Sequence, residues 1–185
     1  MEYLSSMHTL HQRPQHALSL LLALCALTAL TAGCAKLTAT HLQRKTWEAG
    51  VQEKLYGKFM HFDYQAVPLT NEFGVKGTAW PIKENIPVWA DSVQDMNIIV
   101  YLCDEHGNVL AQAKKSYPSQ KLTTKGLAFD FTLKPKPVPG GQLFISFGYH
   151  GMFVASKPPA AGGQGSGNLA GQYVFFASET AALKN

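Results

Sequence analysis

Strict alternation of apolar and polar residues is the feature that most constrains the fold of this chain. In residues 127–133, every second residue is Leu or Phe, and the residues between them are Ala, Asp and Thr. A period of two puts the apolar side chains on one face of a β-strand, whereas a helix needs a period near 3.6. Residues 127–133 are therefore predicted to form a strand with one buried face.

Six further segments have the same extended character. Residues 96–103 are apolar on both faces, which predicts a central strand that is covered on both sides. The other predicted strands are 59–67, 73–82, 109–116, 142–149 and 172–177.

Glycine and proline separate these segments. Gly107 can adopt positive φ in a hairpin loop at 104–108, and residues 83–95 form a long loop. Seven strands at regular spacing, with no long helix between them, predict an all-β fold. We expect an antiparallel, seven-stranded β-sandwich over residues 59–185. Immunoglobulin-like and transthyretin-like topologies both fit this pattern.

Residues 34–58 precede the predicted sandwich. Trp47, Val51, Leu55 and Phe59 recur every four residues, with charged and amide side chains between them. This spacing predicts a short amphipathic helix or a tether that packs against its own domain.

A 14-residue apolar run, Ala17 to Leu30, lies near the start of the chain. It is shorter than the ~20 residues of a membrane-spanning helix, and it has the length of a secretory signal core. Cys34 follows the small residues Ala32 and Gly33, and this ending resembles the lipobox of bacterial lipoproteins. The resemblance implies that residues 1–33 are a signal peptide and that Cys34 carries a diacylglycerol and an added acyl chain such as palmitate.

The residues leave some alternatives open at this end. Translation starts at Met1 or at Met7, and the signal is either cut near Ala32 without lipidation or kept as an anchor. In lipoproteins of Gram-negative bacteria, a residue other than Asp after the lipidated Cys permits export to the outer membrane. By that resemblance, Ala35 predicts a lipid-anchored protein of the outer membrane that faces the periplasm. Two or three acyl chains give lasting attachment.

Charge and cysteine content exclude several classes of protein. The net charge is +4, and its only local concentrations are Lys114–Lys115 and Lys134–Lys136, so we expect no nucleic-acid partner. After removal of the signal, Cys103 is the only cysteine besides Cys34, so no disulfide framework is predicted. We expect Cys103 to be a buried apolar residue.

No catalytic, metal-binding or cofactor-binding residues are predicted. The four histidines after the signal lack the close spacing of a zinc site: His41, His61, His106 and His150. Gly165 to Ala170 matches a G-x-G-x-x-A string, but too few residues follow for a nucleotide-binding unit. The chain is therefore expected not to be an enzyme.

Aromatic residues give the one hint of a binding surface. Trp89, Tyr149 and Phe153 lie in or beside predicted loops, and they are candidates for a platform that binds sugar or protein. Trp80 is interpreted as a core residue.

The predicted function is that of a non-catalytic interaction or assembly module with an envelope protein as its partner. Over residues 34–185, the tether and sandwich resemble, in architecture alone, the transthyretin-like lipoprotein of type VI secretion complexes. A secretion or surface complex is therefore one setting for it. The alternative is a lipoprotein that binds carbohydrate or peptidoglycan through loop aromatics, and the residues do not identify a small-molecule ligand.

Overall fold

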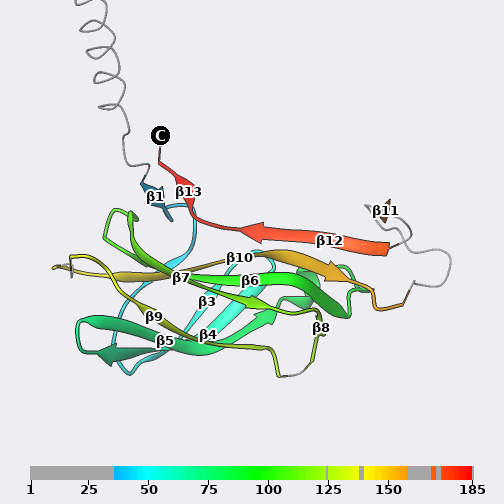
Figure 1. Ribbon diagram of the computed structural model, residues 1–185, viewed down its shortest axis with the longest axis horizontal. Helices are drawn as coiled ribbons and strands as arrows, with labels where there is room; N and C mark the ends of the chain where they lie inside the picture. Colours follow the sequence, from blue (N-terminus) through cyan, green and yellow to red (C-terminus); the bar gives the residue numbers. More distant parts are fainter. Residues whose placement is uncertain (1–35, 124, 138–139, 158–167, 170–171, 185) are drawn as a thin grey trace, which may run out of the picture. The chain divides into compact units, whose positions relative to one another are not determined.

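Antiparallel strands make up most of the described chain. The computed structural model describes residues 36–184 except 124, 138–139, 158–167 and 170–171, and all of these belong to a unit that begins at Lys36. Figure 1 shows the longer strands arranged in two layers. The predicted all-β, antiparallel sandwich is confirmed at this level, and the seven predicted strands are all present.

The first layer is a four-stranded sheet in the order β3-β4-β5-β9. Its strands are β3 (Gln52–Tyr56), β4 (Met60–Leu69), β5 (Glu72–Pro81) and β9 (Leu127–Leu133). In β9, the Leu and Phe residues are buried and the residues between them are exposed, as the period of two predicts. The sheet therefore has one side that faces the core and one that faces solvent.

The second layer is a larger sheet in the order β11-β12-β10-β6-β7. Its strands are β6 (Ser92–Cys103), β7 (Val109–Tyr117), β10 (Phe144–Val154), β11 (Asn168–Leu169) and β12 (Gln172–Glu179). Two short strands extend it, because β2 (Arg44–Thr46) pairs with the start of β10 and β8 (Gln120–Lys121) pairs with the start of β6. Along one edge of β10, β2 occupies residues 144–146 and β12 occupies residues 149–154.

An aromatic cluster joins the two sheets. Phe147 of β10 stacks on Phe62 of β4, with ring centroids 4.5 Å apart and an angle of 7° between the planes. The same ring contacts Tyr64 and Phe129, at centroid distances of 5.1 and 5.3 Å. Burying a side chain of this size stabilises a fold by roughly 1.5–3 kcal/mol. The cluster is therefore a main source of attraction between the layers.

A second, smaller core explains why β6 is apolar on both faces. Ile99, Tyr101 and Cys103 point away from the main core and are buried against Ala39 and Leu42. The cover comes from the segment after β1 (Leu37–Thr38), a strand that pairs with β13 (Ala182–Leu183) near the other end of the chain. The prediction that β6 is central and covered on both sides is confirmed.

The predicted helix within residues 34–58 is wrong for the described residues 36–58. This stretch contains β1, β2 and β3, and Leu55 is buried as an inward-facing residue of β3. These short strands contain too few apolar residues to show a period of two. Gly50, between β2 and β3, has a φ of +81°, which a right-handed helix does not allow. Pairing with β4 and β10 therefore prevails over the four-residue spacing.

The hairpin loop between β6 and β7 follows the prediction closely. Gly107 has a φ of +78°, in the left-handed region that glycine adopts at low cost. Asp104 stabilises the loop because its Oδ1 accepts a hydrogen bond from the Asn108 N–H at 2.8 Å. Part of the predicted loop 83–95 has regular secondary structure: it contains the 3-10 turn η1 (Lys83–Asn85), and β6 begins at Ser92.

Candidate functional site

The proposed lipidation site, Cys34, lies outside the described residues. Lipid attachment at this position therefore stays a prediction from the sequence. Among the residues that the structure describes, no helix has the length and hydropathy of a membrane span.

The predicted platform of Trp89, Tyr149 and Phe153 is not formed. Tyr149 and Phe153 are 0% exposed, because both lie on the inward face of β10. Trp89 is half-buried elsewhere and packs edge-on against Tyr173, with ring centroids 5.5 Å apart. The strand was expected to end at residue 149, but it runs to Val154, and this extension takes Phe153 into the core. The expectation of an exposed aromatic platform at these residues is wrong.

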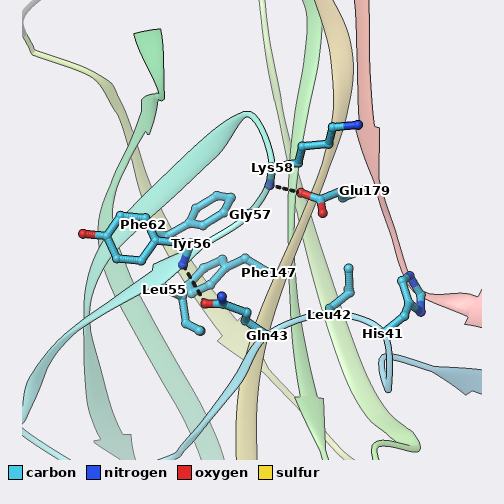
Figure 2. A pocket seen from close by; sticks show the side chains of 10 residues that line it. All are labelled: His41, Leu42, Gln43, Leu55, Tyr56, Gly57, Lys58, Phe62, Phe147 and Glu179. Atoms are coloured by element: carbon cyan, nitrogen blue, oxygen red, sulfur yellow. Dashed lines mark hydrogen bonds between the residues drawn. The ribbon is translucent and has the colours of Figure 1, made fainter. Parts of the chain in front are cut away.

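Tyr149 instead belongs to a polar network that fastens the β3–β4 turn to the larger sheet. Its Oη accepts a hydrogen bond from the Phe59 N–H at 2.8 Å and donates one to Glu179 Oε2 at 2.6 Å. The same carboxylate oxygen accepts the Lys58 N–H at 2.6 Å, as the dashed line in Figure 2 shows. Burial raises the pKa of Tyr149, and the bond to Glu179 raises it further, so the phenol keeps its proton. Gly57 lies against this network, because a Cβ there would be 2.5 Å from Glu179 Oε2 and 3.0 Å from the Tyr149 ring.

This network borders a cleft of about 210 Å³ where β2 and β12 leave the edge of β10. Gln43 Oε1 accepts the Tyr56 N–H at 3.2 Å (Figure 2). His41 Nε2 lies 2.9 Å from the Thr180 carbonyl oxygen. The polar side chains of the cleft thus bind backbone groups of separate elements. We assign His41, Gln43 and Glu179 a structural role, since each of these three side chains holds two segments of the chain together.

A larger cavity of about 750 Å³ lies beside the loop before β6. Its lining is mainly apolar and comes from two parts of the chain: Trp80, Pro81, Lys83, Ile86, Pro87, Val88, Ala90, Asp91, Leu122 and Thr123. Asp91 is engaged structurally, because its carboxylate accepts hydrogen bonds from Ser92 and from Ser156. The arrangement offers an apolar volume without a converging set of reactive side chains from the described residues.

The two outer edges of the larger sheet differ sharply. On β7, Lys114 and Lys115 are exposed, and the edge is tied to β9, because Lys115 Nζ and Tyr117 Oη both donate to the Ala128 carbonyl oxygen. Lysines on an edge strand discourage pairing with another chain. Residues 174–179 of β12 contain neither lysine nor proline, and Phe176 is 65% exposed.

The outer edge of β12 presents main-chain groups. The Ala155 N–H donates to the Tyr173 carbonyl oxygen, which fixes the residues of β12 that point toward β10. Since alternate residues point in opposite directions, the N–H groups of Val174, Phe176 and Ser178 point away from β10. The structure describes a strand on that side, β11, only for Gln172 and Tyr173.

The remaining candidate groups show no reactive arrangement. His61 and Asp63 share one face of β4 as their spacing predicts, with Nε2 and Oδ2 3.9 Å apart. The described residues hold no group of three or more His, Cys, Asp or Glu side chains that could bind a metal. Cys103 is buried, and burial raises the pKa of its thiol to about 12. Most of the G-x-G-x-x-A string lies outside the described residues.

No protein-family model, curated protein or solved structure matches this chain. The fold and the surfaces above are therefore the basis for the functional proposals that follow.

Proposed function

We propose that the chain is a bacterial envelope lipoprotein, held at the outer membrane by lipid on Cys34, that binds another envelope protein and has no catalytic task. The apolar run Ala17 to Leu30 and the small residues before Cys34 support the anchor. A component of a secretion or surface-assembly complex is the class of partner that the tethered sandwich suggests.

The observation that carries the interaction is the outer edge of β12. Its N–H groups at Val174, Phe176 and Ser178 point outward, and the exposed ring of Phe176 supplies apolar contact area. Among the residues that the structure describes, no strand lies beside residues 174–179 on this side, and a sheet edge of this kind binds an extended segment by adding it as a further strand, with main-chain hydrogen bonds for affinity. The β7 edge is less suited to this role, because its lysines oppose pairing.

Site-specific photocrosslinking in intact cells tests this proposal. A photoreactive residue is placed at Phe176 in one strain and at Gln112, an exposed residue of β7, in a matched control strain. We expect a discrete crosslinked envelope protein from position 176 and not from position 112. Equal crosslinking from both positions, or none from either, would contradict binding at β12.

A pair of variants separates main-chain pairing from side-chain contact. Ser178→Pro removes an outward N–H, and edge strands tolerate proline at such positions. Ser178→Ala keeps the N–H and is the control. We expect Ser178→Pro to abolish the crosslink from position 176 and Ser178→Ala to preserve it.

A further inference from the structure

The solvent-facing side of the four-stranded sheet carries an aromatic row. Tyr56 of β3 lies directly opposite His61 of β4, and His61 lies directly opposite Trp80 of β5. Tyr56 is 51% exposed, the His61 side chain is 23% exposed, and Trp80 is partly exposed. The Tyr56 and His61 rings contact each other, with centroids 5.7 Å apart. Because neighbouring strands are about 4.8 Å apart, the row extends across roughly 10 Å of the sheet.

Polar side chains lie beside this row on the same face. Next to this row, two residues away on each strand, Lys54, Asp63 and Thr78 form a second cross-strand row. In it, Lys54 Nζ lies 3.0 Å from Asp63 Oδ1. A third row follows, with Gln52 opposite Gln65 and Gln65 opposite Lys76. A hollow of about 450 Å³ lies at the β5 end of these rows, and from the three rows its lining takes Trp80, Asp63, Thr78, Gln65, Lys76 and Gln52. Tyr56 and His61 lie beside this hollow and do not line it.

The combination of these rows is the chemistry that recognises a sugar. A pyranose ring has faces of C–H groups, which pack on aromatic rings, and a rim of hydroxyl groups, which need both donors and acceptors. Amide, hydroxyl, carboxylate and ammonium groups next to Trp80 supply both kinds of partner.

The charge of the face indicates a neutral ligand. Lys54 and Lys76 are balanced by Asp63 and by Asp130, which lies opposite Lys76 on β9. Burial lowers the pKa of His61 below its usual 6.5, so the aromatic row is uncharged at neutral pH. Balanced charge gives little attraction for a polyanion.

We propose that the outer face of β3, β4 and β5 binds a neutral glycan chain, with one pyranose unit stacked on Trp80 and another on Tyr56. The chain lies across the strands, and its hydroxyl groups bond to the polar rows beside it. This site is on the sheet that does not contain β12 (Figure 1), so it is independent of the proposed protein contact and goes beyond it.

Calorimetry with two soluble probes tests the site on the full chain, purified from membranes in detergent. Chitohexaose represents N-acetylated chains, cellohexaose represents plain glucose chains, and the tighter probe identifies the source of the glycan. We expect Trp80→Ala to weaken binding about tenfold and Tyr56→Ala to weaken it several-fold, since stacking contacts are worth about 0.5–1.5 kcal/mol each. Trp89→Ala is the matched control, because Trp89 is half-buried away from this face.

The outcomes decide the proposal. About half of Tyr56 is exposed, so we expect the Tyr56→Ala variant to fold. This variant tests the site even if the Trp80→Ala variant does not fold, and a thermal unfolding curve of each variant shows whether it is folded. Binding of neither probe at millimolar concentration, or equal affinity in the wild type and in Tyr56→Ala, would overturn the proposal. Loss of the crosslink from position 176 in Tyr56→Ala, with no glycan bound, would instead identify the face as a protein contact. Loss of that crosslink in Ser178→Pro, with glycan affinity unchanged, is the result expected if both proposals hold.

Discussion

Replacing Tyr149 with Phe is the sharpest test of how the two sheets are fastened. The substitution removes one oxygen atom and keeps the buried ring, which is 0% exposed. It leaves the Phe59 N–H without its acceptor at 2.8 Å and removes the donor to Glu179 Oε2. A buried donor without a partner costs about 1–3 kcal/mol. Glu179 still accepts the Lys58 N–H and is partly open to water, so the missing hydrogen bond from Tyr149 to Glu179 adds little to the loss of stability.

We therefore expect Tyr149→Phe to lower the free energy of unfolding by about 2 kcal/mol. For a domain of this size, the melting temperature falls by about 4–8 °C. Urea unfolding followed by tryptophan fluorescence measures the change, and the m-value stays constant because the fold is unchanged. Tyr149→Phe combined with Glu179→Gln should cost less than the sum of the single variants, since both alter one network. A loss below about 0.5 kcal/mol, within the range of ordinary surface substitutions, would refute the structural role of the network.

Three further predictions each concern a single residue. Cys103 is buried with a raised thiol pKa of about 12, so it should react with an aromatic disulfide reagent at pH 8 only after unfolding in denaturant, and rapid reaction in the folded state would contradict its burial. The hydrogen bonds from Ser156 and Ser92 lower the pKa of Asp91 below 3.8; its contribution to stability is thus present above about pH 4 and is lost as the pH falls through the folded-state pKa. Asp91→Asn should therefore flatten the acid limb of a stability profile, and an unchanged limb would count against this bond. Gly77→Ala should prevent soluble folding, because the new Cβ would lie 2.1 Å from the Asp63 carbonyl oxygen, and a wild-type melting curve would disprove that approach.

The strands of the main core could be predicted because each carries enough buried residues to show a period of two. β9 matches its predicted range of 127–133, and the double-sided apolar pattern of β6 correctly indicated a covered central strand. The short strands β1, β2, β3 and β13 could not be predicted, because two to five residues are too few to show a period. Their strand geometry depends on partners far away in the sequence, as in the pairing of Leu37 with Leu183.

The sites were less predictable for a related reason. Strand ends are the least certain part of a pattern, and placing the end of β10 at residue 149 left Phe153 in a loop. The aromatic row was missed because Tyr56, His61 and Trp80 are separated along the chain, and only the register of β3, β4 and β5 brings them together. The interpretation of Trp80 as a core residue is wrong, because Trp80 lies with Thr78 on the solvent-facing side of β5 and is partly exposed, while Ala79 between them is buried. This alternation of Thr78, Ala79 and Trp80 was the available signal.

Intact-mass spectrometry of the native protein, extracted from membranes, tests most directly whether this sandwich is held at a membrane by lipid. The proposed anchor predicts a chain that begins at Cys34 and carries the added mass of a diacylglycerol and an acyl chain. A Cys34→Ala variant should keep residues 1–33 and incorporate no labelled fatty acid. A native chain with an unmodified thiol at Cys34 would contradict the account.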